Sequence, residues 1–238
     1  MRLSMARSYG TFASLVEGLR SAFVHILVLT MALTVAGPSL AEGAAGNGAK
    51  SIKMVVLGDS LSAGLGLSAN DAFPAKLQKA LKDKGINVDI TNAGVSGDTA
   101  SGGRDRLDWS VPEGTQAVIV ELGANDALRG TDPAVTRAAL SDILTRLKAR
   151  NIAVMLCGML APPNYGRDYA ERFNTIYPDL AKSFGVPLYP FFLDGVAADA
   201  KLNQADGIHP TPQGVDIIVQ KMMPMVEAFL GPLTGHHP

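Results

Sequence analysis

Ser60, Asp206 and His209 are the residues of this chain that could together perform nucleophilic chemistry. A serine hydroxyl attacks a carbonyl when a base takes its proton and a third group orients that base. His209 is the only histidine outside the first 41 residues and the last five. Asp206 stands three residues ahead of it, where a carboxylate can hold the imidazole tautomer whose other nitrogen accepts a proton. These types and spacings predict Ser60 as nucleophile, His209 as base and Asp206 as the orienting carboxylate.

Two further residues could supply the hydrogen-bond donors that a developing oxyanion needs. Gly94 follows a predicted strand, and a glycine there lets its backbone N–H approach a substrate closely. Asn125 follows the next predicted strand and offers a side-chain amide. We expect both to form an oxyanion hole with the backbone N–H of Ser60. Taken singly, Gly94 could be only a tight turn, and Asn125 a turn residue that bonds its own backbone.

A regular alternation of strand and helix patterns positions these residues. Met54-Val55-Val56-Leu57 is a short apolar run that ends at Gly58, which is typical of a parallel strand buried on both faces. The expected strands cover residues 53–57, 88–91, 116–122, 152–160 and 186–189. The expected helices run from Asp71, taken as a cap, to Gly85, near 104–109, from Asp132-Pro133 onward, over 169–184, and from Thr211-Pro212 to about Leu230.

Repeated strand–helix units predict a parallel sheet with helices on both faces, a three-layer α/β/α fold. Five strands favour the flavodoxin-like order 2-1-3-4-5, in which the first strand is central. The loops that carry Ser60, Gly94 and Asn125 then converge at one switch point at the carboxyl edge of the sheet. The connection over residues 190–211 is long and irregular, and we expect it to carry His209 back towards the first strand.

Residues 1–41 have the pattern of a secretory signal peptide. Three arginines precede an apolar run over residues 22–36, and small residues follow up to Ala41. This run of 15 residues is short for a bilayer-spanning helix, which needs about 20. We expect cleavage after Ala41 and a periplasmic or secreted protein, with an uncleaved membrane anchor as the alternative. The remaining expected parts are a flexible leader at 42–51, one folded domain at 52–231 and a flexible tail at 232–238.

The composition argues against some partners. Beyond residue 41, 18 of the 21 basic residues and 21 of the 22 acidic residues remain, a net charge of −3. This balance argues against nucleic acid as a partner, and we expect no stable membrane insertion once the signal peptide is removed. Cys157 is the only cysteine, so no disulfide can form within the chain. Because it lies in an apolar run, we expect it to be an inert core residue.

Four sequence blocks resemble the GDSL/SGNH hydrolase family and occur in that family's order. They are Gly58-Asp59-Ser60-Leu61-Ser62, Asn92-Ala93-Gly94, Gly123-Ala124-Asn125-Asp126 and Asp206-Gly207-Ile208-His209-Pro210. Val95-Ser96-Gly97-Asp98-Thr99 and residues 121–130 and 161–177 are further similar to the arylesterase/thioesterase I (lysophospholipase L1-like) branch. The resemblance implies an SGNH hydrolase domain over residues 52–231. It also implies Ser60, Asp206 and His209 as a triad, and Ser60, Gly94 and Asn125 as the oxyanion hole.

The same resemblance implies a serine esterase. Members of this branch hydrolyse aryl esters, short to medium acyl thioesters and lysophospholipids, and bacterial members are often periplasmic. We therefore expect a small-molecule ester or thioester as substrate and an acyl-serine intermediate. The chemistry needs neither a metal nor an organic cofactor.

The loop over residues 159–166 leaves the same sheet edge as the catalytic loops and begins with apolar side chains. Two prolines stiffen it, so it suits one wall of an acyl pocket. Leu160, Asn164 and Tyr165 are therefore candidate substrate-binding residues. Simple packing of the loop against the next helix is the alternative.

Three other functions stay open at this point. A carbohydrate acetyl esterase would share the fold and the serine chemistry. A metal-dependent phosphatase could use Asp59, Asp126, Asp206 and His209 as ligands, although such sites usually have more than one histidine. A non-enzymatic flavodoxin-like binding module would leave the serine, the aspartate and the histidine without a shared role.

Overall fold

The computed structural model describes residues 51–234. The expected signal peptide, nearly all of the expected leader and residues 235–238 lie outside this part of the chain. The strands are β1 (Ile52–Gly58), β2 (Val88–Gly94), β3 (Ala117–Glu121), β4 (Ala153–Cys157) and β5 (Leu188–Tyr189). The helices are α1 (Ser60–Ala63), α2 (Phe73–Asp83), α3 (Ala100–Asp105), α4 (Leu107–Ser110), α5 (Ala124–Leu128), α6 (Pro133–Ala149), α7 (Arg167–Asn174), α8 (Ile176–Phe184) and α9 (Pro212–Thr234). Two 3-10 turns, η1 (Ala69–Asp71) and η2 (Pro163–Tyr165), complete the regular structure.

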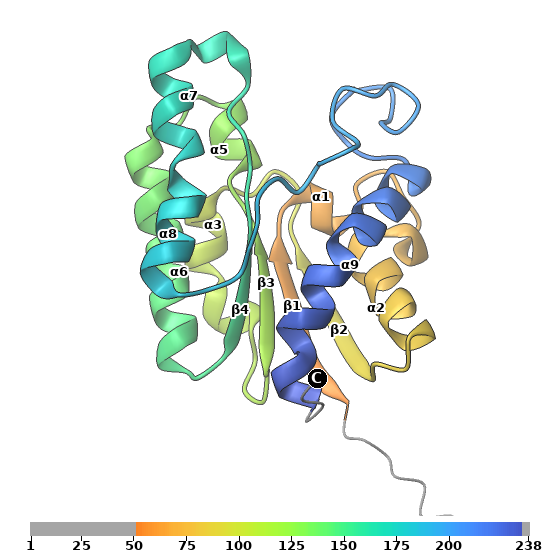
Figure 1. The fold of residues 1–238 in the computed structure, drawn as a ribbon. Coiled ribbons are helices and arrows are strands. Elements are labelled where there is room, and N and C mark those ends of the chain that lie inside the picture. The colour runs from red at the N-terminus through yellow and green to blue at the C-terminus, as the bar shows by residue number, and fades with distance from the viewer. Residues whose placement is uncertain (1–50, 235–238) are drawn as a thin grey trace, which may run out of the picture. The chain divides into compact units, whose positions relative to one another are not determined.

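The sheet has five strands, all parallel, in the order β2-β1-β3-β4-β5. Figure 1 shows α1, α2 and α9 on one side of the sheet and α3, α6 and α8 on the other. Within these outer layers α2 packs on α9 and α3 packs on α6. The predicted three-layer α/β/α fold and its strand order are confirmed.

The central strands form the core. Met54, Val55, Val56 and Leu57 of β1 are each at most 2% exposed, although neighbouring side chains point to opposite faces of the sheet. The apolar residues 117–120 of β3 are fully buried, and so is Cys157, which has no disulfide partner. Burial of apolar surface is the main term that stabilises a fold. The burial of these strands therefore stabilises the part of the sheet from which the loops at its edge begin.

The strand register brings the ends of three strands to one level. Gly58, the last residue of β1, pairs with Gly94 of β2 on one side and with Glu121 of β3 on the other. The segments that follow these strands therefore leave the sheet side by side, at the edge that lies uppermost in Figure 1.

Three helix predictions need correction, and two of them concern helices before the last one. Asp71 does not cap α2, which begins after Ala72 without a side-chain cap, because the Asp71 carboxylate accepts a hydrogen bond from Ser68 within η1 (2.7 Å). The single helix expected over residues 169–184 is two helices, α7 and α8, which meet at Thr175. Pro178 has no N–H to donate to the carbonyl four residues earlier, so one continuous helix would lose a hydrogen bond there.

The last helix starts as predicted but continues further. The Thr211 hydroxyl accepts a hydrogen bond from the backbone N–H of Gly214 (3.2 Å) in the manner of an N-cap. The helix ends at Thr234, so the end expected near Leu230 was wrong and residues 232–234 are helical rather than part of a tail. Leu230 is fully buried and Leu233 packs against the core, which holds the last turn in place.

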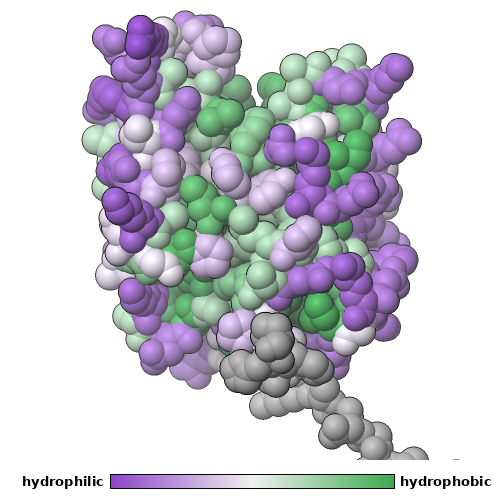
Figure 2. All heavy atoms as spheres, viewed as in Figure 1, coloured by the Kyte–Doolittle hydropathy of each residue, from purple (hydrophilic) through white to green (hydrophobic). Residues whose placement is uncertain are grey.

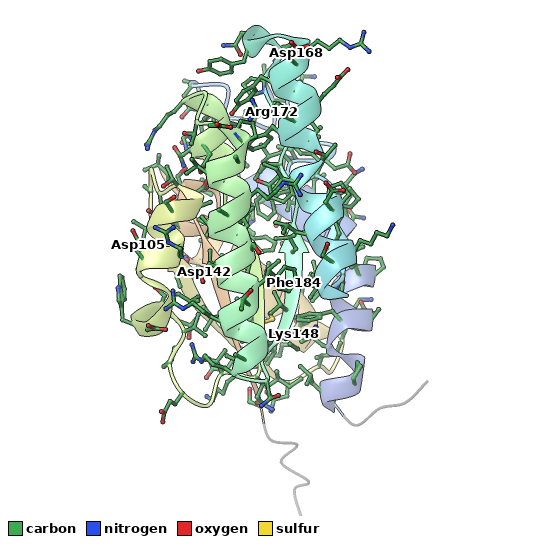
Figure 3. The ribbon with its side chains drawn as sticks, turned by 90° about the vertical axis from the view of Figure 1, so that its left-hand side faces the viewer. Asp105, Asp142, Lys148, Asp168, Arg172 and Phe184 are labelled. Atoms are coloured by element: carbon green, nitrogen blue, oxygen red, sulfur yellow. The ribbon has the colours of Figure 1, made fainter. Side chains whose placement is uncertain are left out.

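Charged side chains connect the helices on their outer faces. Lys148 of α6 donates to the carbonyl of Phe184 at the end of α8 (3.3 Å), and Arg172 of α7 pairs with Asp132 just before α6 (2.5 Å) (Figure 3). Figure 2 shows hydrophilic side chains over the outer helices at both sides of the view and hydrophobic ones between them. Within residues 51–234, none of the helices has both the length and the apolar character that a membrane crossing requires.

Candidate active site

Ser60 begins α1 directly after β1 has ended. Asp59 holds the turn between them, because its carboxylate accepts a hydrogen bond from the backbone N–H of Leu61 (3.0 Å) and so caps the helix. Gly64, in the left-handed conformation, ends α1 after a single turn. This strand–turn–helix unit places Ser60 at the carboxyl edge of the sheet.

His209 lies beside Ser60, although 149 residues separate them in the sequence. Its Nε2 is 2.9 Å from the Ser60 Oγ, and its Nδ1 is 2.6 Å from the Asp206 Oδ2. When the ring proton is on Nδ1 it is donated to the carboxylate, which leaves Nε2 to accept the serine proton. The structure thus brings the three residues together in the order that the sequence predicted.

The Asp206 carboxylate is fixed by its own loop. Its Oδ1 accepts hydrogen bonds from the backbone N–H groups of His209 (3.0 Å) and Ile208 (2.9 Å). These two bonds, the one from His209 foremost, and the contact with the His209 ring lower the pKa of Asp206 to about 2. Asp206 is therefore ionised at neutral pH and can stabilise a positive charge on the imidazole.

Gln204 connects the histidine loop to the serine segment. Its side-chain amide donates to the carbonyl of Leu65, just after α1 (2.7 Å), and to the carbonyl of Pro210 (3.0 Å). Its backbone N–H donates to the carbonyl of His209 (2.7 Å). The connection after β5 therefore reaches back to β1 and is held there by hydrogen bonds.

Asn125 lies at the start of α5, near Ser60 and His209 on the wall of the same cavity. Its side-chain amide donates to the backbone carbonyl of Asp98 (2.9 Å) and to the Asp59 carboxylate (3.2 Å). The two bonds fix the amide plane with its N–H groups directed towards the segments after β1 and β2.

Gly94 does not take the position that the sequence suggested. Its N–H donates to the side-chain oxygen of Asn92 (2.9 Å), and a Cβ at this position would lie 2.3 Å from the backbone nitrogen of Ala63. It is packed under α1, whereas Gly97, three residues later, lines the cavity. Within the described residues the N–H of Gly97 has no protein acceptor. The sequence contained a signal for Gly97, because Gly97 is a glycine inside the loop that follows the strand. Gly94, by contrast, is the last residue of the strand itself.

The cavity beside Ser60 has a volume of about 410 Å³. Apart from Ser60, Asn125 and His209, its walls are mainly apolar, with side chains from α1, α5 and several loops: Leu61, Leu65, Leu128, Met159, Leu160 and Ile208. The upper end of the view in Figure 2 is hollowed between the segment of α7 and the connection before α9. Such a site can take an acyl chain and leave its carbonyl at the serine.

The loop after β4 contributes to this cavity only in part. Leu160 lines it, whereas Asn164 and Tyr165 are not on its wall. The Tyr165 hydroxyl donates to the carbonyl of Leu128 (2.7 Å), so Tyr165 supports another wall residue instead.

A second hollow, of about 680 Å³, lies between α2 and α9. It is larger than the cavity at Ser60, but charged side chains that pair with one another line much of it, such as Lys76 with Asp216 (2.7 Å). It contains no serine or histidine. We therefore place the chemistry at the smaller cavity.

Two buried carboxyl groups lie behind the turn that carries Ser60. Glu121, at the end of β3, is fully buried, and its Oε2 accepts a hydrogen bond from the Ser62 hydroxyl (2.6 Å). Burial, followed by the neighbouring Asp59, raises the pKa of Glu121 well above its ordinary value. Burial also raises the pKa of Asp59 to about 6. The sequence assigned Glu121 no role, because the last residue of a strand does not reveal that a turn from another strand covers it.

The carboxylates considered for a metal site have other partners. Asp126 accepts hydrogen bonds from the backbone N–H of Ala100 (2.8 Å) and from the Thr136 hydroxyl (2.9 Å). Asp59 and Asp206 are engaged by the contacts described above. In the part of the chain that the structure describes, no three His, Cys, Asp or Glu side chains are grouped so that they could hold a metal ion.

The sequence profile of the GDSL-like Lipase/Acylhydrolase family matches residues 56–217, which include every residue of the site. The chain belongs to this family. Esterase TesA of Pseudomonas aeruginosa is 39% identical over 178 residues, which cover 74% of this chain and 89% of the relative. Thioesterase 1/protease 1/lysophospholipase L1 of Escherichia coli K12 is 42% identical over 184 residues, 77% of this chain and 85% of the relative.

A solved structure gives the same relationship. AlinE4, an SGNH-hydrolase family esterase, superposes with a TM-score of 0.64 at 45% identity, over 76% of this chain and 97% of the other. This member of the GDSL-like family is therefore an ester hydrolase with the SGNH fold.

Proposed function

We propose that this protein is a serine esterase that hydrolyses aryl and short to medium acyl esters and thioesters, including lysophospholipids, through an acyl-Ser60 intermediate. The observation that supports this most is the chain of hydrogen bonds from Ser60 through His209 to Asp206. Ser60 and His209 lie on the wall of a mainly apolar cavity. The names of the relatives, an esterase and a thioesterase/lysophospholipase, support the substrate class.

The reaction begins with proton transfer. His209 takes the proton of Ser60 through Nε2 while the serine oxygen bonds to the substrate carbonyl carbon. The ionised Asp206 stabilises the imidazolium. The tetrahedral intermediate then collapses, the histidine gives its proton to the departing alcohol or thiol, and the acyl group stays on Ser60. A water molecule, activated by the same histidine, releases the acid and restores the serine.

Three donors serve the oxyanion in this proposal: the backbone N–H of Ser60, the side-chain amide of Asn125, and the backbone N–H of Gly97 in place of Gly94. Both amide hydrogens of Asn125 are engaged in the free enzyme, one with a backbone carbonyl at 2.9 Å and one with Asp59 at 3.2 Å. We propose that the longer bond gives way when the oxyanion forms. Loss of one such donor lowers kcat by about 10²–10³.

The substrate contacts follow the cavity. Leu160 forms part of the wall against which the acyl chain lies. Tyr165, which follows Asn164, acts indirectly, because its hydroxyl donates to the carbonyl of Leu128, another residue of the wall. The small-molecule ester is the only partner that the mechanism requires. Nucleic acid plays no part in it.

We also propose that the protein is exported. The signal-peptide pattern of residues 1–41 supports cleavage after Ala41 and a mature protein in the periplasm or outside the cell. This mature protein would consist of the leader 42–51, the hydrolase domain from residue 52 to the end of α9 at Thr234, and residues 235–238. The N-terminal sequence of the protein purified from culture medium and periplasm tests this, and a product that begins at residue 1 would contradict it.

The test of the function combines a covalent probe with a substrate series. A fluorophosphonate should label Ser60 in the wild type, and Ser60→Ala or His209→Ala should lower kcat by about 10⁴–10⁶, with the double variant little worse. Ser68→Ala, which removes an exposed hydroxyl outside the cavity, is the matched control and should keep full activity.

Two other outcomes would favour the competing functions. Labelled protein that hydrolyses acetylated sugars but not p-nitrophenyl or thioester substrates would favour the carbohydrate esterase. Turnover by folded Ser60→Ala that a chelator abolishes would favour a metal-dependent hydrolase.

A further inference from the structure

Arg106 is a buried cation at the carboxyl edge of the sheet, where the mechanism assigns it no role. It lies between α3 and α4 and is 7% exposed. Its neighbours in the sequence, Arg104 and Asp105, are not buried in this way, because they pair with each other at the surface (2.7 Å). Figure 3 shows Asp105 on the outer side of α3. A buried guanidinium is costly unless its charge and its N–H groups are matched.

The Arg106 side chain is matched by three different segments. Its Nη2 donates to the carbonyl of Gly58 (2.8 Å), its Nη1 donates to the carbonyl of Ala93 (2.8 Å), and its Nε donates to the Asp98 carboxylate (2.6 Å). A fourth bond runs from Nη1 to the hydroxyl of Ser110 at the end of α4 (3.0 Å).

Each of the three acceptors, Gly58, Ala93 and Asp98, is connected to one donor of the proposed oxyanion hole. Gly58 ends β1 two residues before Ser60, and Ala93 precedes the loop that contains Gly97. The backbone carbonyl of Asp98 accepts the amide of Asn125. One rigid, planar group therefore connects the main chain before the nucleophile, the main chain before the loop glycine, and the residue that holds the asparagine amide.

We infer that Arg106 is a positioning residue of the oxyanion hole, which sets the spacing of its three donors through Gly58, Ala93 and Asp98. This inference rests on the proposed function, because it needs the oxyanion to form at these donors. Lysine cannot replace arginine here, since a single ammonium on a flexible chain cannot reach all three acceptors. None of the contacts of Arg106 involves the side chains of Ser60 or His209, so the proton-transfer side of the site should not depend on it.

The experiment compares four variants: Arg106→Lys and Asp98→Asn, which weaken the connection from its two ends, Asn125→Ala, which removes a donor outright, and Arg150→Lys as control. Arg150 also donates to two backbone carbonyls, those of Val111 (2.6 Å) and Pro112 (3.2 Å), but at the opposite edge of the sheet, where α6 ends. The measurements are kcat, KM and the pH profile with p-nitrophenyl butyrate at 20 °C. They also include the Ki of an alkyl boronic acid, which forms a tetrahedral adduct with the serine, and the melting temperature.

Arg106→Lys and Asp98→Asn should lower kcat about 10–100-fold and raise the boronate Ki by a similar factor, because displaced donors stabilise the tetrahedral state less. KM and the acid limb of the pH profile should stay close to the wild-type values. Arg150→Lys should change none of these. A purely structural role predicts a lower melting temperature with unchanged kcat and Ki at 20 °C, and that result, or a kcat loss without a change in Ki, would overturn the inference.

Asn125→Ala separates this inference from the proposed function. If it leaves the boronate Ki unchanged, the assigned oxyanion hole is wrong. If it raises the Ki while the Arg106 and Asp98 variants do not, the hole stands and the positioning role fails. Should Arg106→Lys not fold, Asp98→Asn alone decides, because it keeps the arginine and the backbone carbonyl that holds Asn125.

Discussion

The side chains of the proposed triad are held in place by contacts of different range. Ser60 is fixed by the turn between β1 and α1, which is local. His209 stands on a long connection, which a hydrogen bond from Gln204 to the carbonyl of Leu65 ties to the segment after α1. Asp206 connects its own loop to the imidazole. One of its carboxylate oxygens accepts two backbone N–H groups of the loop, and the other contacts the His209 ring.

Asp206→Asn should lower kcat by about 10³–10⁴ with little change in KM. An asparagine can still accept from the backbone, but it no longer presents a charge to Nδ1, so the ring loses the partner that fixes its tautomer. The measurement is kcat and KM at pH 7.5, with circular dichroism to show that the variant is folded.

Asp199→Asn is the control for this change. Asp199 lies in the same connection and accepts a hydrogen bond from the backbone N–H of Lys201 (2.8 Å), but it does not contact His209. It should keep its activity. If folded Asp206→Asn retained a tenth or more of the wild-type kcat, the carboxylate would not be the partner of the base.

At the scale of elements, the strands and their order could be predicted because local patterns determine them. Apolar runs that end at Gly58 or Glu121 mark strands buried on both faces, and the repeated strand–helix units leave few arrangements of the sheet. The ends of those strands then placed Ser60 and Asn125 correctly.

The loop glycine was missed because the end of one strand was misjudged. The pattern predicted that the second strand stops at residue 91, but β2 continues to Gly94, which pairs with Gly58 across the sheet. The free loop therefore begins three residues later, and Gly97, rather than Gly94, lies on the wall of the cavity. Strand ends are difficult to predict, since they depend on what a neighbouring strand offers to pair with.

The burial of individual charged side chains also could not be predicted from the sequence. Arg104 and Arg106 stand two residues apart at the end of α3, yet only Arg106 turns inward. Its burial depends on acceptors from β1, β2 and the loop after β2, which meet only in the folded protein.

The loop after β4 should determine the chain-length preference through Leu160. Each methylene that a substrate buries can gain up to about 0.8 kcal/mol, or about fourfold in kcat/KM, until the cavity is full. Rates should therefore rise with acyl length and then level off. Leu160→Ala should move this maximum to longer chains, which a p-nitrophenyl ester series from two to twelve carbons can measure.

Val135→Ala is the matched control, because Val135 and Leu160 are both 49% exposed aliphatic residues and Val135 lies on α6, away from the cavity. It should leave the profile unchanged. If Leu160→Ala multiplied the rates for all chain lengths by one common factor, this loop would not shape the acyl site.

At the scale of the whole molecule, most charges of the described residues lie at the surface. Pairs such as Lys79 with Asp83 are well exposed, and pairs of this kind contribute little to stability. Arg106, Asp126, Asp59 and Glu121 are buried instead, and the last two lie fully buried behind the nucleophile. The carboxyl groups of Asp59 and Glu121 have pKa values that burial raises. Each raises the energy of the folded state when it ionises, because burial disfavours the charged form.

The free energy of unfolding should therefore fall as pH rises through the acid range. The pKa of Asp59 is raised from 3.8 to about 6 by burial, so the folded state binds this proton more tightly than the unfolded state does. The stabilisation by the protonated form is complete below about pH 4 and is lost as pH rises to about 6 and above. Asp206 contributes no slope in this window, because its lowered pKa puts its loss of stabilisation below about pH 4.

Urea unfolding of wild type, Asp59→Asn and Glu121→Gln at pH 4.5, 5.5, 6.5 and 7.5 measures this slope. The difference in unfolding free energy should shift in favour of Asp59→Asn with each step up to about pH 6.5. Glu121→Gln should shift in the same direction and further into the neutral range, since burial and the charge of Asp59 both act on its pKa. Asp83→Asn on the exposed face of α2 controls for the loss of a surface carboxylate. Parallel curves for wild type and Asp59→Asn would mean that Asp59 is not protonated in this range. The burial of two acids beneath Ser60 would then have to be balanced by contacts other than those described.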